Sequence, residues 1–243
     1  RDEAGFVGAY GVRRLGAPEP MAPDSVAWIA SMTKAVTAVA AMRLVEAKRL
    51  SLDAPAVEVL PELAQVQVLE GFDDAGQPVL RAPRTAITLR HLLSHTSGFS
   101  YEMWSPETIK ARKALGLPPM TSGKKAALML PLLFEPGEAW HYGIGLDWAG
   151  RMVEAVTGQT LGAHFAETIF APLRMVDTAF RLRDDMRARL ASIHARGPDG
   201  ALVPLDMIIE QDPEFESGGG GLYSTARDYL TFARMILNGG RHG

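Results

Sequence analysis

A serine and a lysine three positions apart, Ser31 and Lys34, stand where an apolar segment with helical spacing begins, at residues 28–50. Positions i and i+3 of a helix share a face, so the hydroxyl and the amine would lie within hydrogen-bond reach. A serine hydroxyl is a poor nucleophile until a base takes its proton, and a lysine kept neutral by desolvation can be that base. The pair predicts a nucleophilic serine. The alternative is a helix-capping serine beside a solvated lysine.

Tyr142, in the glycine-rich stretch HYGIG at 141–145, is the third candidate for this chemistry. A turn just before a helix lets a phenol point into a cleft, where it can relay a proton between the serine, the lysine and a leaving group. The alternative is an ordinary half-buried tyrosine whose hydroxyl is in water. The presence of Ser31 and Lys34 favours the catalytic interpretation.

Two other patterns are weaker. His91 and His95 have the i, i+4 spacing of a zinc-binding helix, but Leu92 stands where metalloproteases of that kind carry a glutamate base, so packing or capping is favoured. The glycine run 218–221 lacks the Lys-Ser/Thr of a phosphate loop and indicates a tight backbone passage, such as one beside a ligand. No metal site is predicted.

The composition limits the class of partner. The chain has 243 residues, of which 47% are hydrophobic, with 25 basic and 28 acidic residues, and it has no cysteine. This balance, without long runs of charge, predicts a folded protein that acts on a small molecule, with neither nucleic acid nor a membrane as partner. Disulfides and thiolate chemistry are excluded. The start lacks both Met and a signal-peptide pattern, so we expect a trimmed N-terminus and favour a cytoplasmic location.

The periodicity is mostly helical. Only residues 5–15 predict a strand, and a turn is expected at 73–78. Helices are predicted at 31–50, 88–98, 123–131, 146–157 and 160–173, and after a capping box formed by Thr225 and Asp228. A lone strand cannot satisfy its hydrogen bonds, so the chain is either all-α or lacks sheet partners at its ends. We favour the second, because the chain starts mid-pattern and stops after a glycine pair.

Ser31, Lys34 and Tyr142, in this order, lie among three longer stretches that carry a family resemblance. These are ITLRHLLSHTSGF, FEPGEAWHYGIGLDWAGRMVEAVTG and SGGGGLYSTARDYLTFARMIL. With them the chain resembles, over nearly its whole length, the serine β-lactamase-like hydrolases. Within that group it is most similar to the family VIII carboxylesterases, which are themselves similar to class C β-lactamases and penicillin-binding peptidases.

The resemblance implies an α+β fold, with an antiparallel sheet flanked by helices and an additional helical region. Residues 1–57 would form the N-terminal part of the sheet domain and carry the nucleophile. Residues 58–214 would form a mainly helical domain, and residues 215–243 would return to the sheet domain. Some terminal sheet strands would be absent from this chain.

The resemblance also implies a reaction. Ser31 would be acylated by an ester carbonyl, with Lys34 as general base and Tyr142 relaying the proton to the leaving group, without a metal or organic cofactor. We expect a carboxylesterase of short-chain esters that forms an acyl-enzyme. The alternatives are an acyltransferase using the same three residues, a β-lactamase or penicillin-binding peptidase, and an inactive binding relative. The sequence does not predict the oligomeric state, the acyl chain length or the physiological substrate.

The chain departs from the family pattern at two places. Class C β-lactamases place an asparagine two residues after the tyrosine, where this chain has Ile144, so esterase is favoured over β-lactamase. The family's C-terminal motif, which supplies a second oxyanion donor, is expected to lie beyond Gly243. The side chains expected around the substrate are Tyr101, Trp104, Trp140 and Ile144, together with Gly219 and Gly220 of the glycine run.

Overall fold

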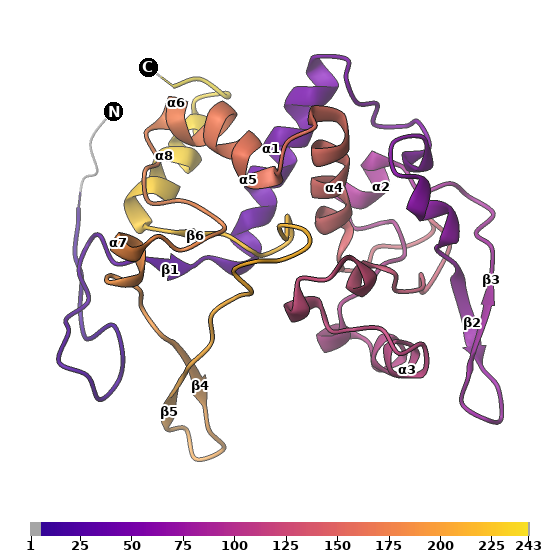
Figure 1. The fold of residues 1–243 in the computed structure, drawn as a ribbon, viewed down its shortest axis with the longest axis horizontal. Helices are drawn as coiled ribbons and strands as arrows, with labels where there is room; N and C mark the ends of the chain where they lie inside the picture. Colours follow the sequence, from indigo (N-terminus) through magenta and orange to yellow (C-terminus); the bar gives the residue numbers. More distant parts are fainter. Residues whose placement is uncertain (1–5, 243) are drawn as a thin grey trace. The chain divides into compact units, whose positions relative to one another are not determined.

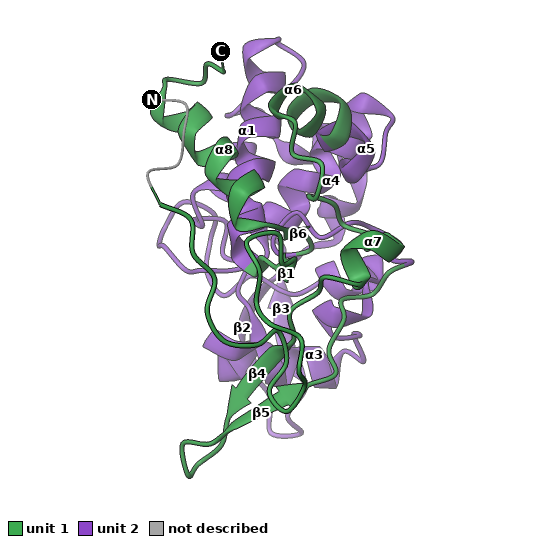
Figure 2. Cartoon of the chain, turned by 90° about the vertical axis from the view of Figure 1, so that its left-hand side faces the viewer, with its two compact units in different colours: residues 1–30, 166–211, 221–243 green, residues 31–165, 212–220 purple. Residues whose placement is uncertain are grey.

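The structure is a computed structural model that describes residues 6–242 (Figure 1). The chain forms two compact units, which are coloured separately in Figure 2. Unit 1 comprises Arg1–Ala30, Ala166–Gln211 and Gly221–Gly243, and unit 2 comprises Ser31–Phe165 and Asp212–Gly220. Every residue expected in the site belongs to unit 2. The compact units divide the chain at other residues than the predicted domains, whose boundaries remain a prediction.

Two helices form the centre of unit 2. Helix α1 (Thr33–Glu46) packs against α4 (Gly145–Thr157), and α2 (Leu89–Leu93) packs against α4 as well (Figure 1). Glycine is needed at position 145, because a Cβ there would overlap the backbone carbonyl of Leu92. Helix α4 ends as predicted at Gly158, which has a φ of 72° and donates its N–H to the Glu154 carbonyl.

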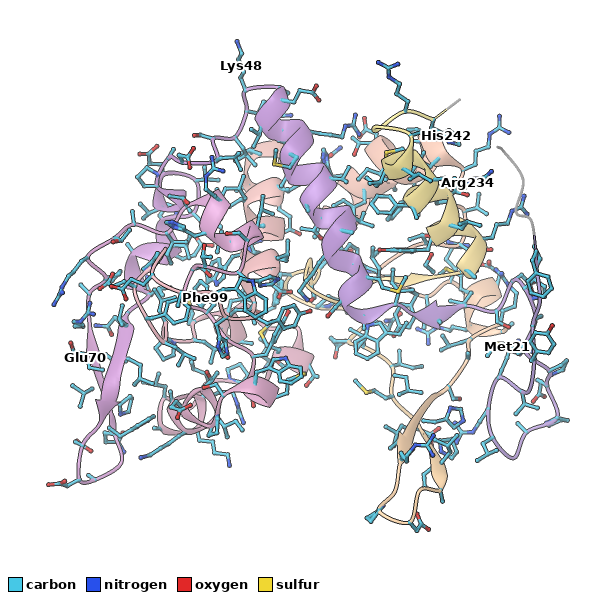
Figure 3. All side chains as sticks on the ribbon, turned by 180° about the vertical axis from the view of Figure 1, so that it is seen from behind. Met21, Lys48, Glu70, Phe99, Arg234 and His242 are labelled. Carbon is cyan, nitrogen blue, oxygen red and sulfur yellow. The ribbon has the colours of Figure 1, made fainter. Side chains whose placement is uncertain are left out.

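The core of unit 2 is closed by aromatic packing beside α4. The rings of Phe99 and Trp148 are stacked with centroids 6.0 Å apart, and both side chains are buried. Phe99, which is labelled in Figure 3, lies among the interior side chains of the unit. Because this packing fixes the segment that follows α2 against α4, it also fixes the loops that leave both helices.

The strands are short. Within residues 6–242 they form three two-stranded antiparallel sheets. Unit 2 has the hairpin of β2 (Val68–Phe72) and β3 (Pro78–Arg81). Unit 1 has β1 (Ala27–Trp28) paired with β6 (Tyr223–Ser224), and the hairpin of β4 (Ile193–Arg196) and β5 (Leu202–Leu205).

The remaining elements are helical. In unit 2 they are α3 (Pro106–Ala114), α5 (Leu161–Phe165) and the 3-10 turns Ala56–Glu58, Pro61–Gln65, Glu102–Trp104, Met120–Ser122 and Lys125–Leu128. In unit 1 they are the π-turn Ala166–Phe170, α6 (Ala171–Leu173), α7 (Asp184–Arg187) and α8 (Ala226–Leu237), and the 3-10 turn Ala30–Met32 joins the two units. In the described part of the chain, no helix combines the length and the apolarity needed to cross a membrane.

Most helices lie where the periodicity predicted them, and the turn at 73–78 joins β2 to β3. The prediction of a strand at 5–15 was wrong for the described residues 6–15. They form a loop with one isolated bridge, from Val12 to Pro20, because Gly11 adopts a φ of 79° and turns the chain back. Residue 5 lies outside the described residues.

Three predicted helices are shorter than expected. The first ends at Glu46 instead of residue 50, because Lys48 takes a left-handed φ of 57°. The helix predicted at 88–98 ends at Leu93, because His95 has a left-handed φ of 59°. The segment 123–131 forms only the 3-10 turn Lys125–Leu128.

At the start of α8 the Thr225 side chain caps the helix as predicted, whereas the Asp228 carboxylate of the predicted capping box accepts hydrogen bonds from the Asp177 N–H and the Thr178 hydroxyl. The cap allows a test of the fold of unit 1. Thr225 is buried, and its hydroxyl accepts a hydrogen bond of 3.2 Å from the Asp228 N–H. We expect Thr225→Ala to lower the free energy of unfolding by about 1 kcal/mol, because it leaves that N–H unpaired. Urea denaturation would measure this. Thr231→Ala, in the interior of α8, is the control, and an equal loss in both variants would contradict the capping role.

Candidate active site

Ser31 lies directly before α1, at a point where the backbone is strained. Ala30 has a φ of 45°, in the left-handed region that alanine rarely adopts. Such a conformation persists only where the surrounding structure fixes it, and it is common next to reactive groups. Ser31 itself is exposed. The first turn of α1 follows it, and the positive end of the helix dipole there favours negative charge.

The three residues predicted to carry the chemistry lie together in unit 2. Lys34 Nζ donates a hydrogen bond of 3.1 Å to Ser31 Oγ, across one turn from the 3-10 segment into α1. The Tyr142 hydroxyl donates to the same oxygen at 2.7 Å. Ser31 Oγ therefore has two groups within proton-transfer distance, and they come from segments more than a hundred residues apart in sequence.

Lys34 is surrounded by groups that favour a positive charge. Its Nζ donates to the Gly219 carbonyl at 2.5 Å. It also lies 5.1 Å from the ring centroid of Tyr101 and 4.8 Å from that of Tyr142. Carbonyl oxygens and aromatic faces both attract a cation. These contacts would stabilise the ammonium that forms when the lysine takes a proton from the serine.

Tyr142 is held by the loop that precedes α4. Glycine is required at the next position, 143, because a Cβ there would overlap the Phe99 carbonyl. The Gly143 N–H also lies 3.4 Å from His95 Nδ1, to which it donates a hydrogen bond. The His95 ring packs on the Tyr142 ring with centroids 4.7 Å apart. The close backbone approach and the histidine together fix where the phenol points.

His95 was assigned only packing or capping from the sequence, and the structure places it against Tyr142. Burial, and then the charge of Lys34, lower the pKa of His95 to about 4. The imidazole is therefore neutral at pH 7, as required for a ring that accepts a hydrogen bond at Nδ1. Its left-handed φ of 59° is the local signal of a constrained position, but nothing in the sequence HLLSH shows it.

The four side chains expected around the substrate differ in their contacts and in their exposure. Tyr101 packs on the Tyr142 ring with centroids 5.4 Å apart, and the exposed Trp140 makes an edge contact with His95 at 6.1 Å. Trp104 is 60% exposed. Ile144 is fully buried, with 0% of its surface exposed, so its side chain packs in the core and does not border an open site.

The two glycines of the predicted site have different environments. Gly219 is buried and contacts Lys34 through its carbonyl. Gly220 is half-buried and donates its N–H to the Ser217 carbonyl at 3.2 Å, which closes a turn. The segment 217–220 is therefore a compact turn that presents one carbonyl to the lysine.

Asp147 is a further buried group near the lysine that the sequence reasoning missed. It lies in the first turn of α4, and it accepts hydrogen bonds from Ser217, Gly219 and Tyr101. An acid in the first turn of an amphipathic helix normally indicates interaction with the helix dipole, so its burial had no signal in the sequence.

Comparison with known proteins decides the family. The model of the family described as Beta-lactamase matches residues 3–243. The chain belongs to the beta-lactamase family. As a member, it has the α+β fold and the superfamily that its motifs predicted, and its characterised relatives are enzymes of the serine hydrolase and acyltransferase type.

Two relatives and one solved structure illustrate the similarity of this beta-lactamase family member. It is 39% identical over 241 residues to a lovastatin esterase of Penicillium rubens, covering 94% of this chain and 60% of the relative. It is 38% identical over 226 residues to a monacolin J acid methylbutanoyltransferase of Aspergillus terreus, covering 90% and 54%. A simvastatin synthase mutant from Aspergillus terreus superposes with a TM-score of 0.85, at 38% identity, over 93% of this chain and 57% of that one. The chain thus spans at most about 60% of these relatives.

The lowered pKa of His95 predicts how stability depends on pH. An unfolded histidine titrates near 6.5, whereas His95 in the folded chain titrates at about 4. Between these values the unfolded state binds a proton that the folded state does not, so the folded state loses stability as the pH falls from 6.5 toward 4. In His95→Asn, which tolerates the left-handed backbone, this loss should be smaller.

Urea denaturation of the wild type and of His95→Asn at pH 4.5, 7 and 9 would measure the effect. The difference in unfolding free energy between the two should be constant from pH 7 to 9 and should shift in favour of the variant at pH 4.5. A difference that is the same at all three pH values would contradict a buried neutral His95.

Proposed function

We propose that this chain carries the acyl-enzyme site of a carboxylesterase, in which Ser31 takes the acyl group of a short-chain ester and water then releases it. The observation that carries the proposal is the contact of Ser31 Oγ with both Lys34 and Tyr142, at 3.1 and 2.7 Å. A serine between two proton-transfer groups matches the requirement for an activated nucleophile. A serine that only capped α1 would need neither neighbour.

The proposed reaction has two steps. In the first, Ser31 Oγ bonds to the ester carbonyl carbon while its proton passes to the Lys34 amine, and the alkoxide leaves with a proton delivered through Tyr142. The C–O bond to the alcohol breaks, and acyl-Ser31 remains. In the second, a water molecule loses a proton to the same pair and attacks the acyl carbon. The carboxylic acid leaves, and Ser31 regains its proton.

The surroundings of the three residues support this role. The Gly219 carbonyl and the two tyrosine rings stabilise the ammonium that Lys34 becomes during the attack. The start of α1 favours the negative charge that develops on the carbonyl oxygen, and the Ser31 N–H would be one donor to it. Opposite charges would thus be stabilised on the two sides of Ser31 Oγ.

The chemistry at position 144 supports an ester over a lactam. The buried Ile144 cannot donate or accept a hydrogen bond to the amide of a penicillin-like substrate. The assignment to the family VIII carboxylesterases, made from the motifs, is part of this proposal. So is the inference that the substrate is a small molecule bearing an ester.

A second candidate function is acyl transfer to an alcohol. It would use the same Ser31, Lys34 and Tyr142, and would differ only in the acceptor that releases the acyl group. One relative is named as a methylbutanoyltransferase and another as an esterase, so both acyl transfer and ester hydrolysis are candidate functions. An exposed aromatic side chain such as Trp140, joined to the site through His95, would suit contact with an acceptor alcohol.

The first prediction of the proposal concerns acylation. A fluorophosphonate or an activated short-chain ester should add one adduct to the wild-type chain and none to Ser31→Ala. In Lys34→Met and Tyr142→Phe the rate should fall by roughly 10²-fold or more, because each variant removes a proton-transfer group. Intact mass spectrometry over time gives these rates. Lys113→Met, an exposed lysine of α3, is the matched control and should label like the wild type. Labelling of Ser31→Ala, or none in the wild type, would contradict the proposal.

The second prediction concerns the acceptor. If water is the natural acceptor, acyl-Ser31 formed with an activated butanoyl ester should disappear in buffer alone, with release of butanoic acid. Adding a primary alcohol should then divert only a minor share into a new ester, measured by chromatography of the products. An acyl-enzyme that persists in buffer and is discharged only by the alcohol would show that the acyltransferase alternative is correct.

A further inference from the structure

A buried carboxylate that the proposed reaction does not use lies next to the catalytic lysine. The Asp147 side chain is 1% exposed, in the first turn of α4. Its Oδ1 accepts hydrogen bonds from the Ser217 hydroxyl at 2.6 Å and from the Gly219 N–H at 3.0 Å. Its Oδ2 accepts from the Tyr101 hydroxyl at 3.3 Å. Burial of a carboxylate is unfavourable unless its oxygens are paired, and here both oxygens are.

Two of these partners lead directly to Lys34. Gly219 donates its N–H to Asp147 and accepts from Lys34 Nζ at its carbonyl, so one residue joins the carboxylate to the ammonium. The approach is so close that a Cβ on Gly219 would overlap both Asp147 Oδ2 and the Tyr101 hydroxyl. This explains the glycine at this position. The next residue back is fixed too, because the Thr37 hydroxyl on α1 donates to the Gly218 carbonyl at 2.7 Å.

Tyr101 gives the second path. Its hydroxyl is held by Asp147 Oδ2, and its ring faces Lys34 Nζ at 5.1 Å. Burial raises the pKa of Tyr101 well above its ordinary value, so the group stays a phenol and can keep donating to the carboxylate. The carboxylate thus orients both the carbonyl and the aromatic face that Lys34 contacts.

The electrostatics are consistent with this arrangement. Burial raises the pKa of the Asp147 carboxyl, whereas the hydrogen bonds from Ser217 and Gly219 and the charge of Lys34 act in the opposite direction.

We propose that Asp147 is a positioning residue of this site, which holds Lys34 against Ser31 through the Gly219 backbone and the Tyr101 phenol. It acts through these neighbours and does not touch the reacting atoms. The proposal rests on the proposed function, because it assigns Asp147 a role in the acylation of Ser31. This role differs from that of a residue that only stabilises the fold.

Asp147→Asn tests this with little change in shape. The amide keeps an oxygen for Ser217 and Gly219, but it loses the charge and presents an NH₂ to Tyr101. The matched control is Glu154→Gln on the same helix. Glu154 has a side chain 13% exposed and is also hydrogen-bonded, to Arg151 at 2.5 Å and to the Leu161 N–H at 3.0 Å, but it has no contact with Lys34. Both variants remove one carboxylate charge from α4.

The first measurement is the fluorophosphonate labelling of Ser31, resolved into the binding constant and the maximal rate constant. We expect Asp147→Asn to lower the rate constant by about tenfold and Asp147→Ala by about 10²-fold, with binding unchanged, because a small displacement of a reacting group has effects of this size. Glu154→Gln should stay within about twofold of the wild type. Wild-type rates in Asp147→Asn, or equal losses in Asp147→Asn and Glu154→Gln, would overturn the proposal.

The second measurement does not depend on activity. With ¹³C-labelled lysine, the ε-carbon resonance of Lys34 can be identified among the six lysines by its loss in Lys34→Met. We expect Asp147→Asn to move this resonance and Glu154→Gln to leave it in place. If the wild type fails to label but the resonance moves only in Asp147→Asn, the proposed function fails and the positioning role stands. A resonance that stays in place in Asp147→Asn overturns the positioning role.

Discussion

The placement of one amine beside one hydroxyl is the constraint on which the site depends. Lys34 Nζ must lie within hydrogen-bond distance of Ser31 Oγ, yet a partly buried amine keeps its position only if other groups hold it. The Gly219 carbonyl and the rings of Tyr101 and Tyr142 do so. Each comes from a different segment of unit 2, so the packing of that unit is what brings them to α1.

Glycines make this convergence possible. At positions 143, 145 and 219 a Cβ would overlap a carbonyl oxygen or the Asp147 carboxylate. At each of these points the backbone passes where a side chain would have no room, and α1, α2, α4 and the turn 217–220 can therefore approach one another closely. The short distances between Lys34 and its polar neighbours therefore result from helix packing and not from the local sequence alone.

The sequence predicted the parts of this arrangement that depend on local spacing. Ser31 and Lys34 are neighbours by helical periodicity, and the helices around 146–157 and after Thr225 follow from their patterns and caps. Tyr142 was named from its glycine-rich turn before a helix and from its place among the family motifs, but no local spacing predicts its contact with Ser31, which spans 111 residues. Asp147 and His95 had no such signal. Their roles arise from burial and from a left-handed backbone, which depend on tertiary packing.

The same reasoning explains why Ile144 was predicted at the substrate and lies in the core. Its position two residues after Tyr142 was judged from the family pattern, in which a polar side chain faces the ligand. Gly143, which lies between Tyr142 and Ile144, brings the backbone against the Phe99 carbonyl. Ile144 is the N-cap residue of α4, and its side chain is fully buried. An apolar side chain gains free energy by packing there, whereas an asparagine would need a partner. Ile144 therefore belongs to the apolar core at the start of α4, where its side chain has no group that could hydrogen-bond an amide.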